Sequence, residues 1–422
     1  MTPMHKSAIL FALLAAAALM PLAAAGQERA LRGVALVVGE GGYANLPALA
    51  NPPNDARDVG DLLSDLGFDV TTVSDADHRR LTRSFERFAE DAAEADVALV
   101  YYSGHGIEAA GANYLVPVDA DISTPETAGQ SLVPLSGLLD ELAKSVPVTI
   151  VLLDACRTDP FPAGQVIALP DTGEMVPVDG TGLAVVRGPT PVQRADAGSE
   201  SLGMVIGFAA EPGAAALDGA PGENSPYAAA LIKHVAANGT PFSDIMTMVT
   251  EEVYLKTRAQ QLPWTNSSLR RVLSFGEAPE PAEGDEALIR DGRRALLMTI
   301  STAPEATRRY VETVAANERV PLDALYGMLK VLGVDTADPS AIEAQLEAGA
   351  KRLKLLLEQQ TGAAKFDPEL IRLSDLAGKA EQEGAMDVAL KFREQATARA
   401  DTLEVQVDAN EANLKQDRLQ IG

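Results

Sequence analysis

Short apolar runs of strand length alternate with longer amphipathic runs over residues 32 to about 275. The runs that predict strands are 34–38, 68–73, 97–102, 146–153, 204–209 and 271–275. The runs that predict helices are 54–66, 80–95, 135–143, a segment beginning at 226, and 242–259. The third strand run has no polar position, which is typical of a strand buried on both faces. The alternation predicts an α/β fold, a mainly parallel sheet sandwiched by helices.

The pattern changes in the second half of the chain. Residues 158–201 are rich in Pro, Gly and Asp without a sustained period, which predicts a long surface loop. An acidic, Pro-rich linker at 277–286 separates a domain at 26–276 from a mostly α-helical module at 287–422. Within that module Gly384, Ala389 and Ala396 are spaced as in one tetratricopeptide helix pair, although a plain helical hairpin explains them too.

The first 25 residues predict a secretory signal peptide. A basic pair, His5-Lys6, precedes an apolar run at 8–20, and three alanines at 23–25 follow Pro21. The apolar run is short for a membrane span, so an uncleaved anchor is the lesser alternative. We therefore expect a periplasmic or secreted protein.

Charge and cysteine count narrow the function classes. The chain carries 60 acidic and 35 basic residues and a formal charge of −25, which argues against nucleic-acid binding and fits a cationic partner. Cys156 is the only cysteine, so the chain forms no internal disulfide. A lone cysteine is either a small buried apolar residue or a functional thiol, and its surroundings must decide.

Two motifs supply those surroundings. The third strand run is followed by Ser103-Gly104-His105-Gly106, and the fourth by Asp154-Ala155-Cys156-Arg157. Because the carboxyl ends of parallel strands meet at one edge of a sheet, the imidazole and the thiol are expected to meet there. A thiol needs such a base to become a thiolate, and a near-neutral imidazole can later protonate a leaving amine. The amides of Gly106 and Cys156 are candidates for an oxyanion hole.

With these motifs the chain resembles the caspase-like cysteine peptidases (clan CD, caspase family), especially the metacaspase-type and bacterial orthocaspase-type members. The histidine precedes the cysteine by about fifty residues, as in caspases. The segments Glu223–Tyr227 and Gln260–Trp264 also look like those of bacterial members. The resemblance spans about 31–275 and implies a caspase-like fold with His105 and Cys156 as the catalytic dyad.

The resemblance also implies a substrate preference. Caspases that select aspartate have Gln two residues before the cysteine, whereas this chain has Asp154, as metacaspases commonly do. Asp55 of an Asn-Asp-Ala sequence and Ser103 match the other substrate-binding positions of metacaspase-type enzymes. Two carboxylates in one desolvated pocket favour a cation, so we expect cleavage after Arg or Lys. Asp55 is alternatively a first-turn acid that complements the helix dipole.

Two departures from the family pattern bear on processing. The chain has Thr158 where caspases have glycine, and its following loop is long. Arg187 and Arg194 in that loop are possible autocleavage sites, although basic loop residues are common on surfaces. Some metacaspases need calcium. Asp119 and Asp121 are available, but no dense ligand loop appears, so we predict neither a metal site nor a cofactor.

The sequence therefore predicts an exported cysteine endopeptidase acting on peptides or proteins with Arg or Lys before the cleaved bond. One alternative is a catalytically weak or inactive caspase-like scaffold whose helical module binds a protein partner. Another is a cysteine hydrolase that acts on a non-peptide amide.

Overall fold

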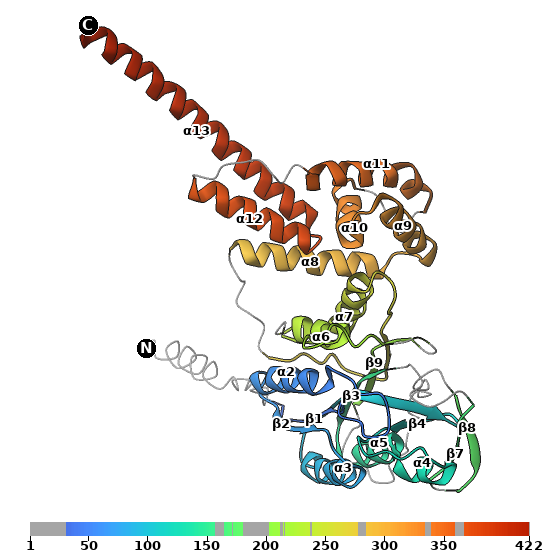
Figure 1. The fold of residues 1–422 in the computed structure, drawn as a ribbon. Helices are drawn as coiled ribbons and strands as arrows, with labels where there is room; N and C mark the ends of the chain where they lie inside the picture. Colours follow the sequence, from blue (N-terminus) through green and yellow to red (C-terminus); the bar gives the residue numbers. More distant parts are fainter. Residues whose placement is uncertain are drawn as a thin grey trace, which may run out of the picture. The chain divides into compact units, whose positions relative to one another are not determined.

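The computed structural model (Figure 1) describes residues 31–156, 164–170, 172–179, 202–211, 214, 216–236, 239–276, 284–333, 339–358 and 367–421. The predicted leader, most of the predicted linker, and Arg187 and Arg194 lie outside these ranges. All contacts described below lie within one compact unit, Gly33–Gly422. Among the helices in the ranges above, none combines the length and the apolar character that crossing a membrane requires.

The sheet at the centre of the first half confirms the predicted α/β class. Its strands lie in the order β10 (Trp264–Ser267), β9 (Gly203–Phe208), β6 (Val148–Cys156), β3 (Val97–Ala109), β1 (Gly33–Gly39) and β2 (Asp69–Ser74). Only β10 pairs antiparallel along this path, and the other pairings are parallel. The carboxyl ends of the parallel strands consequently share one edge, where α/β folds place their ligands.

Helices cover both faces of this sheet (Figure 1). One face packs against α2 (Pro52–Asp65), α6 (Pro226–Val235) and α7 (Phe242–Lys256), and the other against α3 (His78–Ala92) and α5 (Leu135–Ser145). Alternate residues of β3 divide between the faces, because side chains alternate along a strand. Thus Leu99 and Tyr101 belong to the first core and Val100 and Tyr102 to the second.

Three local predictions are wrong. The third strand does not end at 102 but continues to Ala109, where it pairs with β4 (Ala112–Leu115). Part of the predicted 158–201 loop forms a hairpin, β7 (Val166–Ala168) with β8 (Met175–Asp179). The last strand is β10, whereas the strand predicted at 271–275 contributes one isolated bridge, Ser274 with Pro241. These strands pair through backbone groups, which periodicity of side chains does not report.

A short α4 (Pro125–Ser131) and β5 (Val133–Pro134) complete this half.

The described residues beyond 284 form helices, as the prediction of a helical module requires. They are α8 (Asp285–Ser301), α9 (Glu305–Glu318), α10 (Leu322–Val331), α11 (Pro339–Glu358), α12 (Pro368–Gln382) and α13 (Met386–Ile421). Gly384 turns the chain between α12 and α13 with a φ of 66°, and Ala389 is fully buried. The small residues therefore allow close packing of a helical hairpin, while the tetratricopeptide assignment stays a prediction.

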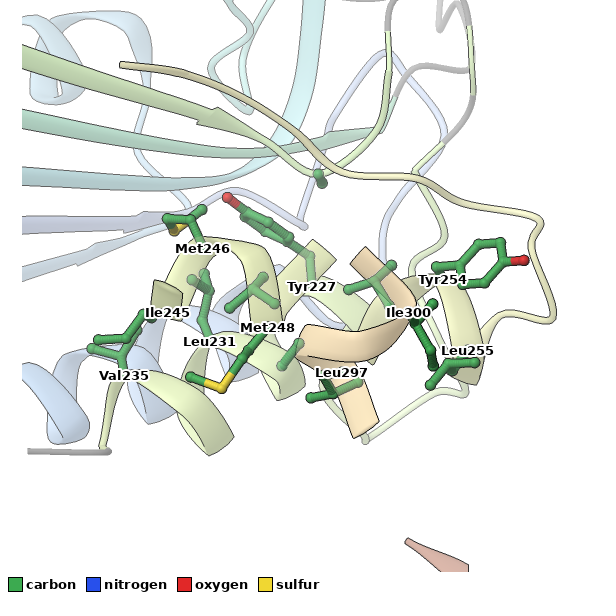
Figure 2. Packing of buried hydrophobic residues seen from close by; sticks show 14 of the residues in the cluster. Tyr227, Leu231, Val235, Ile245, Met246, Met248, Tyr254, Leu255, Leu297 and Ile300 are labelled. Carbon is green, nitrogen blue, oxygen red and sulfur yellow. The ribbon is translucent and has the colours of Figure 1, made fainter. Parts of the chain in front are cut away.

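The apolar core continues across the predicted linker. Leu297 and Ile300 of α8 pack with side chains of α6 and α7 such as Leu231 and Leu255 (Figure 2). Two adjacent buried glutamates of α7 also bind arginines of the module: Glu251 contacts Arg308 in two hydrogen bonds of 2.9 and 2.6 Å, and Glu252 contacts Arg293 in two of 3.0 and 3.1 Å. The helical module is thus joined to the sheet domain by both apolar and charged contacts.

Candidate active site

The register of β3 and β6 brings the two motifs together. Ser103 lies opposite Asp154, and His105 lies opposite Cys156. Neighbouring strands are about 4.8 Å apart. Ser103, His105 and Asp154 continue the alternate series that begins at Val97 and Val148, so they lie on the face covered by α2, α6 and α7. The predicted meeting of the histidine and the cysteine at one sheet edge thus agrees with the backbone.

His105 is almost fully buried and is held by defined contacts. Its Nε2 lies 2.8 Å from the carbonyl oxygen of Pro47, and its Nδ1 is buried and has no hydrogen-bond partner among the side chains and backbone groups that the structure describes. Because a carbonyl only accepts, Nε2 carries the proton and Nδ1 presents a lone pair. Burial lowers the pKa of His105, while the contact with Pro47 and the charge of Asp218 act in the opposite direction. The neutral ring is therefore suited to accept a proton at Nδ1.

Asp55 lies in the first turn of α2 and is completely buried. It reaches the sheet because Gly39 ends β1 without a side chain: a Cβ there would lie 2.2 Å from the Pro52 carbonyl oxygen. Its Oδ2 accepts a hydrogen bond of 3.1 Å from Ser103 Oγ, and its Oδ1 accepts one of 2.9 Å from the Ser225 backbone N–H. The structure therefore brings Asp55 and Ser103 together, as predicted.

Asp154 belongs to the same cluster. Its Oδ2 accepts hydrogen bonds from the hydroxyl of Ser225 and, at 3.0 Å, from the hydroxyl of Tyr101. Ser225 thus bridges the two aspartates, its N–H on one and its hydroxyl on the other. We call Asp55 and Asp154 the acidic pair. Within the described residues no hydrogen bond or ion pair joins either carboxylate to a Lys, Arg or His side chain.

The missing counter-charge has an electrostatic consequence. Burial, then the charge of Asp154, raises the pKa of Asp55. Burial also raises the pKa of Asp154, although hydrogen bonds from Ser225 and Tyr101 oppose this. Two like charges in a desolvated site cannot both ionise cheaply. The acidic pair therefore holds a proton near neutral pH unless a cation enters.

Sequence reasoning missed several residues that shape this site. Asp218 is half-buried, accepts a 3.2 Å hydrogen bond from the Ala50 N–H, and acts electrostatically on His105 and on both members of the acidic pair. Burial raises its pKa. Its only sequence signal was its place in a Gly-rich connection between a strand and a helix, where ligand-binding residues commonly lie.

Two asparagines at the start of α2 bind the same connection. The sequence predicts a helix that begins at Asn54, but α2 begins earlier, after Asn51, and the Asn54 amide donates to the Asn224 side chain at 2.9 Å. Asn51 is fully buried, donates to the carbonyl of Ala220 at 2.9 Å and accepts from the Gly222 N–H at 2.9 Å. Side chains that suit helix caps are used here for long-range contacts.

The other predicted site residues lie as follows. Gly106 is in β3 opposite Leu115 of β4, and its role in an oxyanion hole stays a prediction. Asp119 accepts a 2.8 Å hydrogen bond from the His78 N–H at the start of α3, and Asp121 accepts one of 2.9 Å from the Ser123 N–H in a local turn. Over the described ranges, no group of three or more His, Cys, Asp or Glu side chains is placed to hold a metal ion.

Comparison with known proteins identifies the family. The family model described as the caspase domain, of peptidase family C14, matches residues 32–274. The chain is 31% identical over 132 residues to the mouse homolog of mucosa-associated lymphoid tissue lymphoma translocation protein 1, and 31% over 124 residues to the human protein. These matches cover 31% and 29% of this chain but only 16% and 15% of the relatives.

A solved structure, caspase-1 from Spodoptera frugiperda, is 18% identical and covers 59% of this chain and 92% of its own, with a TM-score of 0.40. The family model itself covers more than half of the chain, including both motifs and every member of the site described above. By that match, the chain belongs to the caspase-domain family of peptidases.

Proposed function

We propose that the chain is an exported cysteine endopeptidase that cleaves after Arg or Lys, with Cys156 as nucleophile and His105 as general acid and base. The observation that carries the preference for basic residues is the buried acidic pair, which lacks a cationic partner among the described side chains. The position of Cys156 opposite His105 in the β3–β6 ladder supports the dyad. Export rests on the sequence of residues 1–25.

The proposed reaction uses His105 twice. Its Nδ1 takes the thiol proton, and the resulting thiolate attacks the carbonyl carbon of the scissile bond, with the amides of Gly106 and Cys156 stabilising the oxyanion. The C–N bond then breaks, and the amine leaves with the proton from Nδ1. Water then gives a proton to the same nitrogen and attacks the thioester carbonyl. The C–S bond breaks, the acid is released, and the proton passes from Nδ1 to the sulfur, which restores the thiol and the neutral ring. The hydrogen bond from Nε2–H to Pro47 holds the ring in the required tautomer throughout.

Substrate recognition would use the acidic pair and Asp218. A guanidinium or ammonium entering the pocket lets both buried carboxylates ionise and forms charge-assisted hydrogen bonds with them. An acidic side chain would meet repulsion at the same place. Ser103 and Ser225 hold the two carboxylates in position.

The test is peptide cleavage by the protein lacking residues 1–25. We expect it to hydrolyse fluorogenic peptides that end in Arg or Lys, to ignore the Asp-ended peptide, and to lose activity as Cys156→Ala. Preference for Asp, or activity that survives in the variant, would contradict the proposal. A thiol-reactive peptide ending in arginine separates an enzyme from a scaffold, because only the enzyme is labelled stoichiometrically at Cys156. A short arginine amide tested beside the peptides separates a peptidase from an amidase.

Mass spectrometry of the same protein beside Cys156→Ala tests self-processing. Cleavage after Arg187 or Arg194 in the wild type alone would support both activity and specificity. An unprocessed wild type that still cleaves peptides would exclude autocleavage at these two residues.

A further inference from the structure

Two tyrosine hydroxyls bind the backbone of His105 from either side. The His105 N–H donates a 2.7 Å hydrogen bond to the hydroxyl of Tyr43, in the connection between β1 and α2. The His105 carbonyl accepts a 2.7 Å hydrogen bond from the hydroxyl of Tyr102, and a further one of 3.1 Å from the Val116 N–H. Both tyrosines are buried, Tyr102 completely. The peptide groups on both sides of the imidazole are therefore fixed.

Tyr43 also contacts the imidazole itself. The two ring centroids are 4.4 Å apart, with the planes inclined by 41°. The same connection supplies the Pro47 carbonyl that receives the Nε2 proton. One segment thus determines where the backbone of His105 lies, how its ring is oriented and which nitrogen carries the proton.

Gly104 makes room for both hydroxyls. A Cβ at this position would lie 2.8 Å from the Tyr43 oxygen and 2.9 Å from the Tyr102 oxygen, closer than real Cβ contacts. The residue has a φ of 154°. The glycine before the histidine is therefore explained by the two tyrosines as well as by access of a ligand.

We propose that Tyr43 and Tyr102 are positioning residues that hold His105 with Nδ1 free to exchange a proton. This rests on the proposed role of His105 as acid and base for Cys156. Packing alone does not account for the arrangement, because it leaves a buried ring nitrogen to which no described residue is hydrogen-bonded, a feature that folded proteins rarely retain without a use. Tyr43 contributes more than Tyr102, since the His105 carbonyl keeps the Val116 N–H when the Tyr102 hydroxyl is removed.

The decisive variants are Tyr43→Phe and Tyr102→Phe in the full chain without residues 1–25. Tyr43→Phe keeps the ring contact and removes the acceptor of the His105 N–H. We expect kcat to fall by about 10-fold with KM unchanged, a fraction of the 10²- to 10⁴-fold that acid–base catalysis supplies. Tyr102→Phe should lower kcat by a smaller factor. Tyr326→Phe, an equally buried tyrosine of α10, serves as the control and should leave kcat unchanged.

Two measurements need no substrate. Because Cys156 is the only cysteine, the pH profile of its alkylation by iodoacetamide reports its thiolate directly. Tyr43→Phe should move this profile toward that of a free thiol. In ¹⁵N-histidine spectra, assigned with His105→Gln, the wild-type ring should be protonated at Nε2, and Tyr43→Leu should give a mixture of tautomers.

The outcomes separate the two proposals. A wild type that cleaves no peptide would refute the proposed function, while alkylation and the tautomer would still decide the role of the tyrosines. If Tyr43→Phe lowers only the melting temperature, and leaves kcat, the alkylation profile and the tautomer as in the wild type, the tyrosine is structural and the positioning role is wrong. Should Tyr43→Leu not fold, the measurements on Tyr43→Phe alone decide between the two roles.

Discussion

The two ends of α6 contact two buried charged clusters, one without a cationic side chain among the described residues and one that contains an arginine. At its start, Ser225 binds the acidic pair, two carboxylates for which the described residues provide no cation. Near its end, His234 contacts Glu252 at 3.1 Å, and Glu252 is bound by Arg293 in a cluster that includes Asp323. We call the second group, Arg293 with Glu252, His234 and Asp323, the Arg293 cluster.

The carboxylates of the acidic pair and that of Glu252 in the Arg293 cluster have pKa values that are shifted in opposite directions. Burial raises the pKa of both members of the acidic pair. Burial acts in the same direction on Glu252, but hydrogen bonds from His234 and the charge of Arg293 overcome it and hold the pKa of Glu252 well below its usual range. A balanced buried cluster joins two parts of a structure, whereas an unbalanced one is costly until a ligand completes it. We infer that the Arg293 cluster stabilises the molecule and that the acidic pair recognises the substrate.

The largest effect is expected from breaking the Arg293 cluster. Arg293→Met leaves the buried Glu252 with only His234 and the partly exposed Lys233 beside it and also removes the partner of Asp323, so the free energy of unfolding should fall by about 3–5 kcal/mol. Urea unfolding measures this. Replacing both partners, Arg293→Met with Glu252→Leu, should restore most of the loss. Arg290→Met on the same helix removes an exposed 3.8 Å ion pair and should change little. Equal losses for Arg290 and Arg293 would contradict the comparison.

The next effect concerns binding at the acidic pair. Asp55→Asn removes one carboxylate that a basic substrate would meet, which costs about 2–5 kcal/mol when the partner is a buried charge. That corresponds to about a 30- to 4,000-fold lower kcat/KM for Arg-ended peptides. Asp61→Asn, an exposed position on the same helix, is the matched control. Unchanged kinetics in Asp55→Asn would show that the acidic pair does not recognise the basic residue.

A related effect should appear in the pH dependence of stability. The pKa is raised to about 8 for Asp55 and to about 6 for Asp154, in both first by burial, while an unfolded aspartate titrates near pH 4. Between about pH 4 and 8 the folded chain therefore holds more protons than the unfolded chain. The free energy of unfolding consequently falls as pH rises through this window.

Urea unfolding of wild type and Asp55→Asn at pH 5 and pH 8 measures this dependence. The asparagine variant should gain stability relative to wild type as pH rises, because it cannot acquire the buried charge. A difference between the two proteins that does not vary with pH would show that Asp55 is not the group responsible.

The smallest effect is expected at Ser225. Its hydroxyl caps α6 by accepting from the Ala228 N–H at 2.9 Å and also binds Asp154. Ser225→Ala should lower stability by about 1 kcal/mol, the usual worth of a helix cap, and Ser225→Thr should keep most of it. Thermal unfolding detects the difference. If Ser225→Thr loses as much as Ser225→Ala, the hydroxyl is not the stabilising group.

The comparison also shows which predictions the sequence supports well. His105, Cys156, Ser103 and Asp154 follow apolar strands, and their separation along the chain is enough to place them at one sheet edge. Asp55 is predicted from the short Asn-Asp-Ala sequence that contains it. Wrong predictions arose where side-chain pattern and backbone pairing disagree. The strand β10 is largely polar yet pairs with β9, whereas residues 271–275, three of which are apolar, do not form a strand.

By itself, the sequence determined the alternating strands and helices, the two motifs and the helical character of the second half. These depend on periodicity and on residues near one another in the chain. Only the tertiary structure decided that Ser225 bridges Asp55 and Asp154, that Tyr43 holds His105, and that Arg293 binds Glu252. Such contacts join residues far apart in sequence. Their existence depends on how helices and connections pack over the sheet, and no local pattern encodes that packing.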